Sequence, residues 1–211
     1  MQKDILTNRK YTRWFDQDNI PEKKVIKSLI ETTFELVPSK QNLIPYLITV
    51  FGPEHKKEKE EIIKLSTRKK MMTDWGKNLN TQLAAPYLVI FSTRFITNPN
   101  KKVKDMMKRG IEFKTCRKEK FNHSAVKIAA SLEIGMFCMI LTKLALEHQI
   151  DTAYTSCHFN DPKGQTMVEN EVLFVMSLGY YDPTKSYKDF KDMKIKSGEV
   201  KPNMKDVIIW K

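Results

Sequence analysis

The fold of this chain can be traced from one stretch, Asn8-Arg9-Lys10-Tyr11-Thr12-Arg13-Trp14-Phe15-Asp16, in which three cations precede an aromatic pair. Arg9 and Arg13 are four residues apart, so on a helix or a tight turn they would lie on one face and grip one anion, with Lys10 beside them. We call residues 8–16 the cation segment and predict that it binds phosphate. A solvated basic surface is the competing interpretation, because 37 of the 211 residues are Lys or Arg.

A helix and a loop follow the cation segment. Asn19-Ile20-Pro21-Glu22 is typical of a helix start, with a proline near the first turn and an acid close to the positive end of the helix dipole. Apolar residues at helical spacing continue to Val37, and Pro38 ends the helix. The chain then passes through Pro38-Ser39-Lys40-Gln41-Asn42-Leu43-Ile44-Pro45 into a predicted buried strand at residues 46–51. We call residues 38–45 the 38–45 loop.

The cation segment and the 38–45 loop, in this order, resemble the nitroreductase-like flavoprotein family. In that family an Arg-rich N-terminal element holds the phosphate of FMN, and a Pro-Ser-Ser-x-Asn-x-Gln-Pro-Trp segment lines the flavin site from the partner subunit. Pro38, Ser39, Asn42 and Pro45 match that segment. The resemblance therefore implies that both the loop and the cation segment contact FMN.

The chain departs from the family pattern at four of these positions, which are Tyr11, Lys40, Ile44 and Tyr46. Tyr11 stands where a small hydroxyl residue usually contacts the phosphate. We expect phosphate binding to survive the departures better than hydrogen bonding to the flavin ring, because the cations of the first segment remain. The FMN-binding residues implied in the two segments are Arg9, Lys10, Tyr11, Arg13, Pro38, Ser39, Lys40 and Asn42.

An asparagine before the second predicted strand is the next residue that the resemblance assigns to the flavin. In the family an Asn at this place pairs with the pyrimidine edge of the flavin, and Asn78 matches it when counted back from the strand predicted at residues 84–91. Asn80 is the alternative. A turn residue is an equally good interpretation of either one, because Asn near Gly is a common turn composition.

Positions later in the chain complete the implied site. Residues 152–158 align with the strand and loop that pass the reactive nitrogen of the flavin, where the chemistry needs a backbone N–H donor. Ser156 and Cys157 are the candidates, and a small buried thiol is the competing interpretation of Cys157. Lys201 resembles the element that brings a last cation to the FMN phosphate, and Lys196 competes with it. No side chain is required as a general acid, so we assign no catalytic residue.

The order of predicted elements indicates an α+β fold with a central, mostly antiparallel sheet flanked by helices. A length of 211 residues suits one domain. A long apolar helix runs to about His148, and Glu133-Ile134-Gly135 within it matches an Asp-x-Gly of the family, where the small residue allows close packing at the dimer interface. We assign residues 93–121 as a candidate lid. Residues from about 181 to 211 would form a C-terminal arm that, in the family, adds to the partner's sheet in a homodimer.

Composition restricts the class of ligand. The net charge of +12 suits an anionic ligand such as a flavin phosphate or a pyridine dinucleotide, and it equally suits nucleic acid. The three cysteines form no C-x-x-C pair and the four histidines have no metal-binding spacing, so we predict no metal site. The sequence also contains no Walker loop, no G-x-G-x-x-G after a strand and no G-x-S-x-G. FMN is the one cofactor for which the sequence contains candidate binding residues.

The same features predict a location. The first ten residues contain no apolar signal region, and the longest apolar stretch, residues 134–142, is too short to span a bilayer. An odd number of cysteines favours a reducing compartment. We therefore expect a soluble, cytoplasmic protein with no membrane contact.

The sequence thus predicts an FMN-dependent oxidoreductase that works as a homodimer. By family analogy, NAD(P)H reduces the flavin by hydride transfer, and an electron-poor acceptor such as a nitro compound or a quinone reoxidises it. Two alternatives stay open. One is a divergent family member that binds flavin without turnover. The other is a basic nucleic-acid-binding protein, although the lysines are spread over many helices with no aromatic platform for stacking bases.

Overall fold

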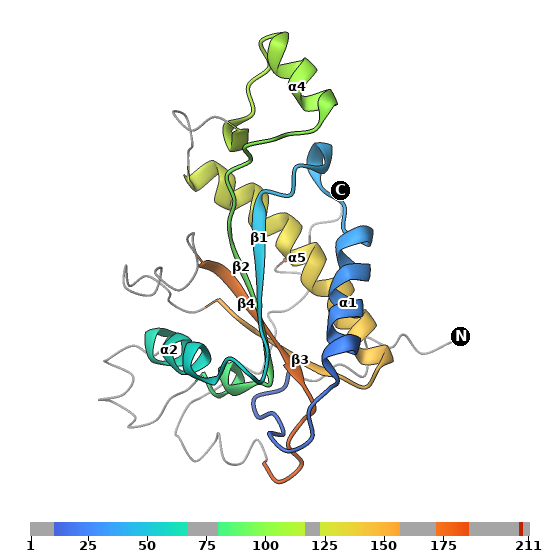
Figure 1. Ribbon diagram of the computed structural model, residues 1–211, viewed down its shortest axis with the longest axis vertical. Helices are drawn as coiled ribbons and strands as arrows, with labels where there is room; N and C mark the ends of the chain where they lie inside the picture. The colour runs from blue at the N-terminus through green and yellow to red at the C-terminus, as the bar shows by residue number, and fades with distance from the viewer. Residues whose placement is uncertain (1–10, 67–79, 117–122, 157–171, 186–206, 209–211) are drawn as a thin grey trace.

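A computed structural model describes residues 11–66, 80–116, 123–156, 172–185 and 207–208 of the chain (Figure 1). Among these residues it contains four α-helices, four strands and three short 3-10 helices. In chain order they are α1 (Lys23–Leu36), η2 (Lys40–Asn42), β1 (Tyr46–Phe51), α2 (Lys56–Ser66), η3 (Thr81–Ala84), β2 (Tyr87–Thr93), α4 (Lys101–Lys108), η4 (Lys114–Cys116), α5 (His123–Glu147), β3 (Asp151–Thr155) and β4 (Val172–Gly179). The predicted α+β class is confirmed.

The strands form one antiparallel sheet in the order β1-β2-β4-β3. β2 is buried along its whole length, which suits a central strand of apolar and β-branched residues. It begins at Tyr87, later than the predicted start at residue 84, because residues 81–84 form η3 and Pro86 has no N–H to give to the ladder. β1 and β3 are the edges. The predicted antiparallel sheet flanked by helices is therefore confirmed.

Helices cover the two faces of the sheet differently. α1 and α5 pack on one face, where Tyr46, Phe91 and Phe137 meet edge to face with ring centroids 5.4–6.4 Å apart. α2 and η3 lie against the other face, over a smaller cluster that includes Leu88, Ile90 and Val175. Figure 1 shows α2 on one side of the sheet, with α1 and α5 on the opposite side. The sheet is thus sandwiched between a thick and a thin helical layer.

The helix α5 carries large apolar residues on its exposed side as well as on its buried side. One side, with Ile134, Phe137 and Leu141, is buried against the sheet. The other side exposes four large apolar residues: Ile128, Leu132, Met136 and Met139. Residues Val126–Glu147 are long and apolar enough to cross a membrane, whereas the sequence was expected to contain no apolar stretch of that length. In the structure this helix packs against the sheet and α1. The apolar surface of α5 is therefore only partly buried in the core of the fold.

The predicted lid contains a helix that the sequence did not reveal. α4 begins after Asn100, whose side chain accepts a hydrogen bond from the Val103 N–H, and it ends before Gly110 in a left-handed conformation (φ 86°). A small cluster of Leu43, Ile96 and Val103 fixes it to the 38–45 loop. The prediction missed it because Val103 is the one buried apolar residue in a run of lysines.

The cation segment is also different from the prediction. Its described part, from Tyr11 onward, is not helical: Tyr11 forms a parallel bridge with Thr152, and Phe15 an antiparallel bridge with Tyr181. Residues two apart on an extended chain share a face, and the guanidinium carbon of Arg13 lies 5.0 Å from the centroid of the Tyr11 ring. The segment therefore runs along the sheet edge.

The aromatic cluster at the centre of the core gives a stability prediction. Phe137 is fully buried between Tyr46 and Phe91. Replacing it by alanine should lower the free energy of unfolding by about 3–5 kcal/mol, because a large cavity would remain in the core. Urea denaturation measures this change. The exposed Leu36→Ala is the control and should change stability by less than about 0.5 kcal/mol, and an equal loss in both variants would contradict the core described here.

Candidate functional site

Hydrogen bonds attach the cation segment to β3. The Thr12 N–H donates to the Thr152 carbonyl at 3.4 Å, and the Tyr11 hydroxyl donates to the Tyr154 carbonyl at 2.6 Å. The hydroxyl of Tyr11, predicted to lie where the family contacts phosphate, therefore anchors the segment to the strand. The Tyr154 side chain is in turn hydrogen-bonded to the hydroxyl of Thr142 on α5. Tyr11 and Thr12 are therefore fixed through β3 to the core helix.

A buried glutamine connects the cation segment to the end of β3. Arg13 donates from Nη1 to Gln82 Oε1 at 3.1 Å, and Gln82 Nε2 donates to Thr155 Oγ1 at 2.9 Å. Gln82 lies in η3 and is only 2% exposed, so both ends of its amide are used inside the protein. Gln82 has no role among the residues predicted from the sequence. The only sequence feature that could have indicated this role is that Gln82 is a polar residue between Asn80 and an apolar strand.

These contacts gather residues from three predicted parts of the flavin site. Arg13 comes from the cation segment, the buried Asn80 precedes β2, and Ser156 follows Thr155 at the end of β3. We call Tyr11, Arg13, Asn80, Gln82 and the 155–156 strand end the cation patch. The other predicted residues of this half, Arg9, Lys10, Asn78, Cys157 and Lys201, lie outside the described residues.

The 38–45 loop has a strained backbone. Gln41, Asn42 and Ile44 have positive φ angles of 58°, 53° and 47°. Such a conformation is uncommon for any residue other than glycine and is an outlier for a β-branched residue such as Ile44. Each strained residue costs about 1–3 kcal/mol, so the surroundings must hold it in place. Within the loop, Ser39 Oγ accepts a hydrogen bond from the Ile44 N–H at 2.9 Å.

Three other elements hold the loop through its backbone. Each supplies a side chain or a backbone group that hydrogen-bonds a loop N–H or carbonyl. The bonds are Lys40 N–H to Glu133 Oε1 of α5 (3.1 Å), Asn100 Nδ2 beside α4 to the Gln41 carbonyl (2.8 Å), Arg94 Nη1 after β2 to the Ile44 carbonyl (3.2 Å), and the Arg94 N–H to the Pro45 carbonyl (3.0 Å). The loop is therefore a preformed, rigid surface. Lys40 and Asn42 are exposed on it.

The cation patch and the 38–45 loop lie apart within one chain. Tyr46, which follows the loop, pairs with Thr93 at one end of the sheet. The cation segment lies along β3, the opposite edge strand, where Asp151 pairs with Gly179 at the other end of the sheet and Thr155 pairs with Val175 near its middle. Figure 1 shows η2 beside the start of β1 and the residue 11–20 segment near the other end of the sheet. The described residues of one chain do not bring the two halves of the predicted site together.

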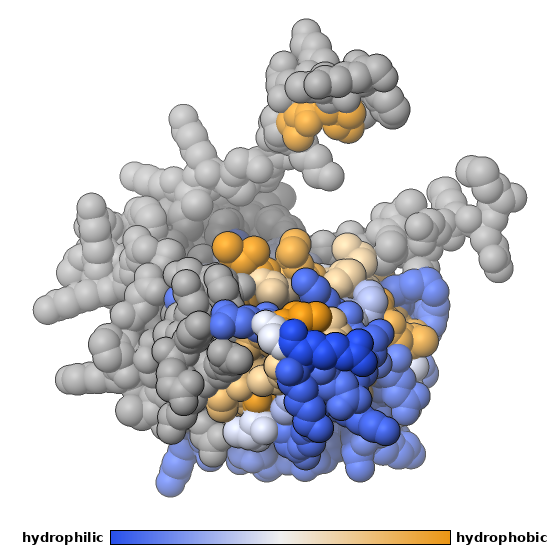
Figure 2. Space-filling model, turned by 90° about the horizontal axis from the view of Figure 1, so that it is seen from above, coloured by the Kyte–Doolittle hydropathy of each residue, from blue (hydrophilic) through white to orange (hydrophobic). Residues whose placement is uncertain are grey.

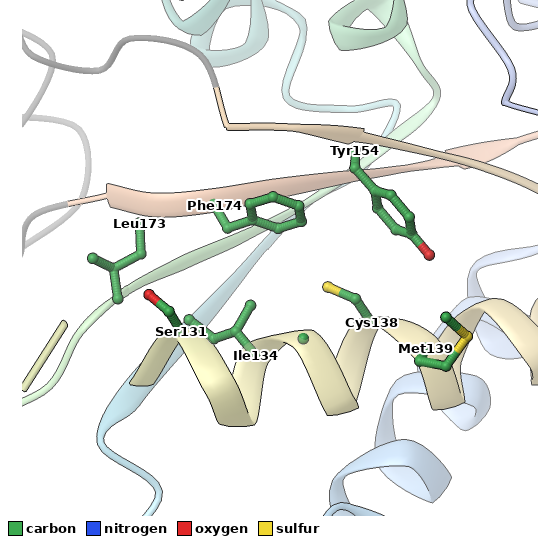
Figure 3. Close-up of a pocket in the computed structure, with 8 residues that line it drawn as sticks. Ser131, Ile134, Cys138, Met139, Tyr154, Leu173 and Phe174 are labelled. Atoms are coloured by element: carbon green, nitrogen blue, oxygen red, sulfur yellow. The ribbon is translucent and has the colours of Figure 1, made fainter. Parts of the chain in front are cut away.

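An apolar cavity of about 290 Å³ lies between α5 and the β3–β4 side of the sheet (Figure 3). Figure 3 shows Tyr154, Leu173 and Phe174 on the strands above Ser131, Ile134 and Cys138 of α5. Burial raises the pKa of the Cys138 thiol to about 12, so it stays protonated at neutral pH and is a poor nucleophile. The described lining of the cavity is mostly apolar. Among the described residues, no three His, Cys, Asp or Glu side chains are placed to hold a metal ion.

The comparisons with known proteins identify the fold. No family model and no curated protein matches the chain. Solved structures do match it over nearly the whole length of both chains. A putative NAD(P)H:FMN oxidoreductase from Staphylococcus epidermidis is 14% identical, with a TM-score of 0.69 over 100% of this chain and 96% of that one.

Two further solved structures agree with this match. A putative nitroreductase from Exiguobacterium sibiricum, in complex with FMN, is 17% identical, with a TM-score of 0.65 over 99% and 96% of the two chains. A mutant of an FMN- and NADPH-dependent nitroreductase from Sphigopyxis sp. is 13% identical, with a TM-score of 0.62 over 98% and 96%. The sequence resemblance is thereby confirmed at the level of structure: the chain has the nitroreductase-like α+β fold.

Proposed function

We propose that the protein is an FMN-dependent oxidoreductase that takes a hydride from NAD(P)H and passes it to a nitro compound, a quinone or a similar electron-poor acceptor. The observation that carries the proposal is the Arg13–Gln82–Thr155 chain of hydrogen bonds. It joins the segment predicted to bind the FMN phosphate to the strand end predicted to pass the reactive nitrogen. The solved structures similar in fold are described as oxidoreductases or nitroreductases, one of them in complex with FMN.

The FMN molecule is assigned to the cation patch in this proposal. Gln82 holds the guanidinium of Arg13 in one orientation, so that Arg13 acts with Arg9 and Lys10 on the phosphate. Ser156 is exposed where β3 ends, so a backbone N–H of residue 156 or 157 is the donor for the reactive nitrogen. Asn78 and Lys201 would complete the binding site. The bound flavin supplies the hydride chemistry, and the chain binds and orients it.

The site would be completed by a second copy of the chain. A flavin in the cation patch is remote from the 38–45 loop of its own chain, so the loop of a partner would supply Pro38, Ser39, Lys40 and Asn42. The exposed Ile128, Leu132, Met136 and Met139 of α5 offer an apolar surface for this contact, and Gly135 beside them leaves room for close approach. Figure 2, viewed from the α4 end, shows apolar residues lying open beside a strongly hydrophilic area.

The C-terminal arm has a place to bind on such a partner. β1 is an edge strand, and a groove of about 610 Å³ lies along it between α1 and β1, lined by Ile30, Phe34, Ile48 and Val50 among others. No described strand pairs with the outer edge of β1, and a free strand edge beside an apolar groove can accept an added strand. The apolar end of the arm, which includes Val207 and Ile208, has the composition to fill it.

A flavin-binding protein without turnover is the second candidate function. The Tyr11 hydroxyl is bonded to the Tyr154 carbonyl, so the family's small hydroxyl contact to the phosphate is replaced by a structural one. Lys40 and Ile44 are also departures of the loop from the family pattern, so the side chains that would face the flavin differ from those of the family. Retention of FMN tests both candidates, and reduction by NAD(P)H separates them.

The first prediction from this proposal concerns the absorbance spectrum of the purified protein, measured after FMN is added and the excess is removed. Flavin bands should remain at about one FMN per chain, because each chain supplies one cation patch, and they should bleach when NADPH or NADH is added without oxygen. Bands that persist under NAD(P)H would support the second candidate. Absence of retained flavin would contradict the proposal.

The second prediction concerns Arg13. Arg13→Ala should weaken FMN binding by about 1.5–3 kcal/mol, as expected for the loss of a hydrogen bond between charged groups. Isothermal titration with FMN measures the change. Lys24→Ala removes one exposed positive charge from α1 and should leave the affinity unchanged. If both variants bind like the wild type, Arg13 does not contact the phosphate.

The third prediction concerns the α5 surface. The wild type should be a dimer by light scattering, and Leu132→Glu with Met136→Glu should give a folded monomer that no longer retains FMN, because charges would be buried at the interface. Lys24→Glu, which puts the same kind of charge on α1 outside this surface, should remain a dimer. A monomeric double variant that binds FMN normally would show that one chain makes the whole site.

A further inference from the structure

The 38–45 loop is not held in place by close packing alone. A second cavity, of about 210 Å³, lies between the loop and α5, and its lining includes Leu43, Pro45 and Val126. Where a hollow replaces protein atoms, the residues around it lose packing contacts. The loop also has positive φ angles at three residues, which its surroundings must hold. Hydrogen bonds are therefore needed to keep the loop in its conformation.

These hydrogen bonds are distributed unequally along the loop. Arg94 bonds two carbonyl groups of the second half, and the exposed Asn100 bonds the loop at its centre. In the first half, residues 38–40, the Lys40 N–H donates to Glu133 Oε1 at 3.1 Å. Within the described part of the chain, Glu133 is the one residue outside the loop that hydrogen-bonds this half. The first half therefore depends on a single side chain of α5.

The burial of Glu133 makes this hydrogen bond strong and also costly to provide. Glu133 is only 7% exposed, and its other oxygen, Oε2, is buried without a hydrogen-bond partner among the described residues. A buried acceptor without a donor lowers stability. A hydrogen bond to a charged group, however, is about twice as strong as one between neutral groups. The hold on the Lys40 N–H is the contribution that offsets the cost of the buried carboxyl group.

The neighbours of Glu133 on α5 connect the loop to the second chain. Leu132 precedes it and Met136 follows one helical turn later, and both are exposed on the surface assigned above to the dimer contact. One turn of α5 would thus meet the partner on one side while it holds the loop on the other. In the proposed site this loop serves the flavin of the partner. A change at Glu133 should therefore act on the flavin of the other chain.

We propose that Glu133 is a positioning residue for flavin binding in the partner chain. It makes no contact with the flavin itself. It holds residues 38–40 so that Ser39 and Asn42 reach the FMN in the cation patch of the other chain. This role rests on the proposed function, and it adds to the site a residue that the family resemblance relates only to helix packing.

Amide hydrogen exchange at Lys40 tests the hydrogen bond without any flavin. Glu133→Ala removes the acceptor, so the Lys40 N–H should exchange at least about tenfold faster than in the wild type, the factor expected for a lost charged hydrogen bond. Glu133→Gln keeps an oxygen for this N–H and should restore most of the protection. Glu147→Ala, at an exposed site of the same helix, is the control and should exchange like the wild type. Equal exchange in the wild type and Glu133→Ala would overturn the proposal.

Titration of the same variants with FMN tests the effect on the flavin. Glu133→Ala should bind FMN about tenfold more weakly than the wild type, because the loop that completes the site is released. Glu133→Gln should bind FMN within about threefold of the wild type, since rescue by a neutral acceptor is expected of a positioning residue. An affinity of Glu133→Ala equal to that of the wild type would show that the flavin does not depend on Glu133.

Mixed dimers of Glu133→Ala with Arg13→Ala show on which chain Glu133 acts. One site then combines the intact cation patch of the Glu133→Ala chain with the intact loop of the Arg13→Ala chain, and it should bind FMN like the wild type. Such recovery could not follow a general loss of folding in the Glu133→Ala chain, whose own patch is used. Mixed dimers that form without recovery would overturn the proposal. Absence of FMN retention by the wild type would instead contradict the proposed function, even if Lys40 exchange confirms the hydrogen bond.

Discussion

The rest of the structure depends on the burial of α5, a helix that carries large apolar residues on its exposed side as well as on its buried side. The sheet and α1 cover one side of it, and a single chain has no further layer for the other among its described residues. A helix with apolar residues on both sides is stable in water only when both sides are covered. This constraint connects the fold to the proposed function, because whatever covers the open side also lies beside Glu133 and the loop that Glu133 holds.

The division of the predicted flavin site follows from the same arrangement. The sheet separates the cation patch from the 38–45 loop, and each half is rigid for its own reason. Gln82 and the Tyr11 hydroxyl fix the first half to β3. Hydrogen bonds from α5, α4 and Arg94 fix the second half in a strained conformation. Strain held by several surrounding elements is typical of a binding surface, and we propose that a two-fold dimer brings the loop of one chain to the cation patch of the other, since the two lie along opposite edge strands of one sheet.

Much of the fold could be predicted from the sequence because its strands are short, apolar and β-branched and its long helix is continuous. Local sequence patterns did not predict the features whose structure depends on residues far away in the chain. Gln82 gains its role from Arg13 and Thr155, which are far away in the chain. α4 has one buried residue and no apolar stripe, and its position depends on Leu43 and Ile96. Gln41 and Ile44 have positive φ angles, which these residue types rarely adopt. The sequence could not predict them, because hydrogen bonds from distant residues hold the loop in this conformation.

The central claim is that two chains share each flavin site, and subunit complementation tests it most directly. Arg13→Ala damages the cation patch, and Ser39→Ala with Asn42→Ala damages the loop. Each variant alone should bind FMN more weakly than the wild type and keep less of it when the excess is removed. When the two are unfolded and refolded together, mixed dimers should regain flavin absorbance at one site, where an intact patch of one chain meets an intact loop of the other. A mixture that stays colourless, although mixed dimers form, would contradict the account.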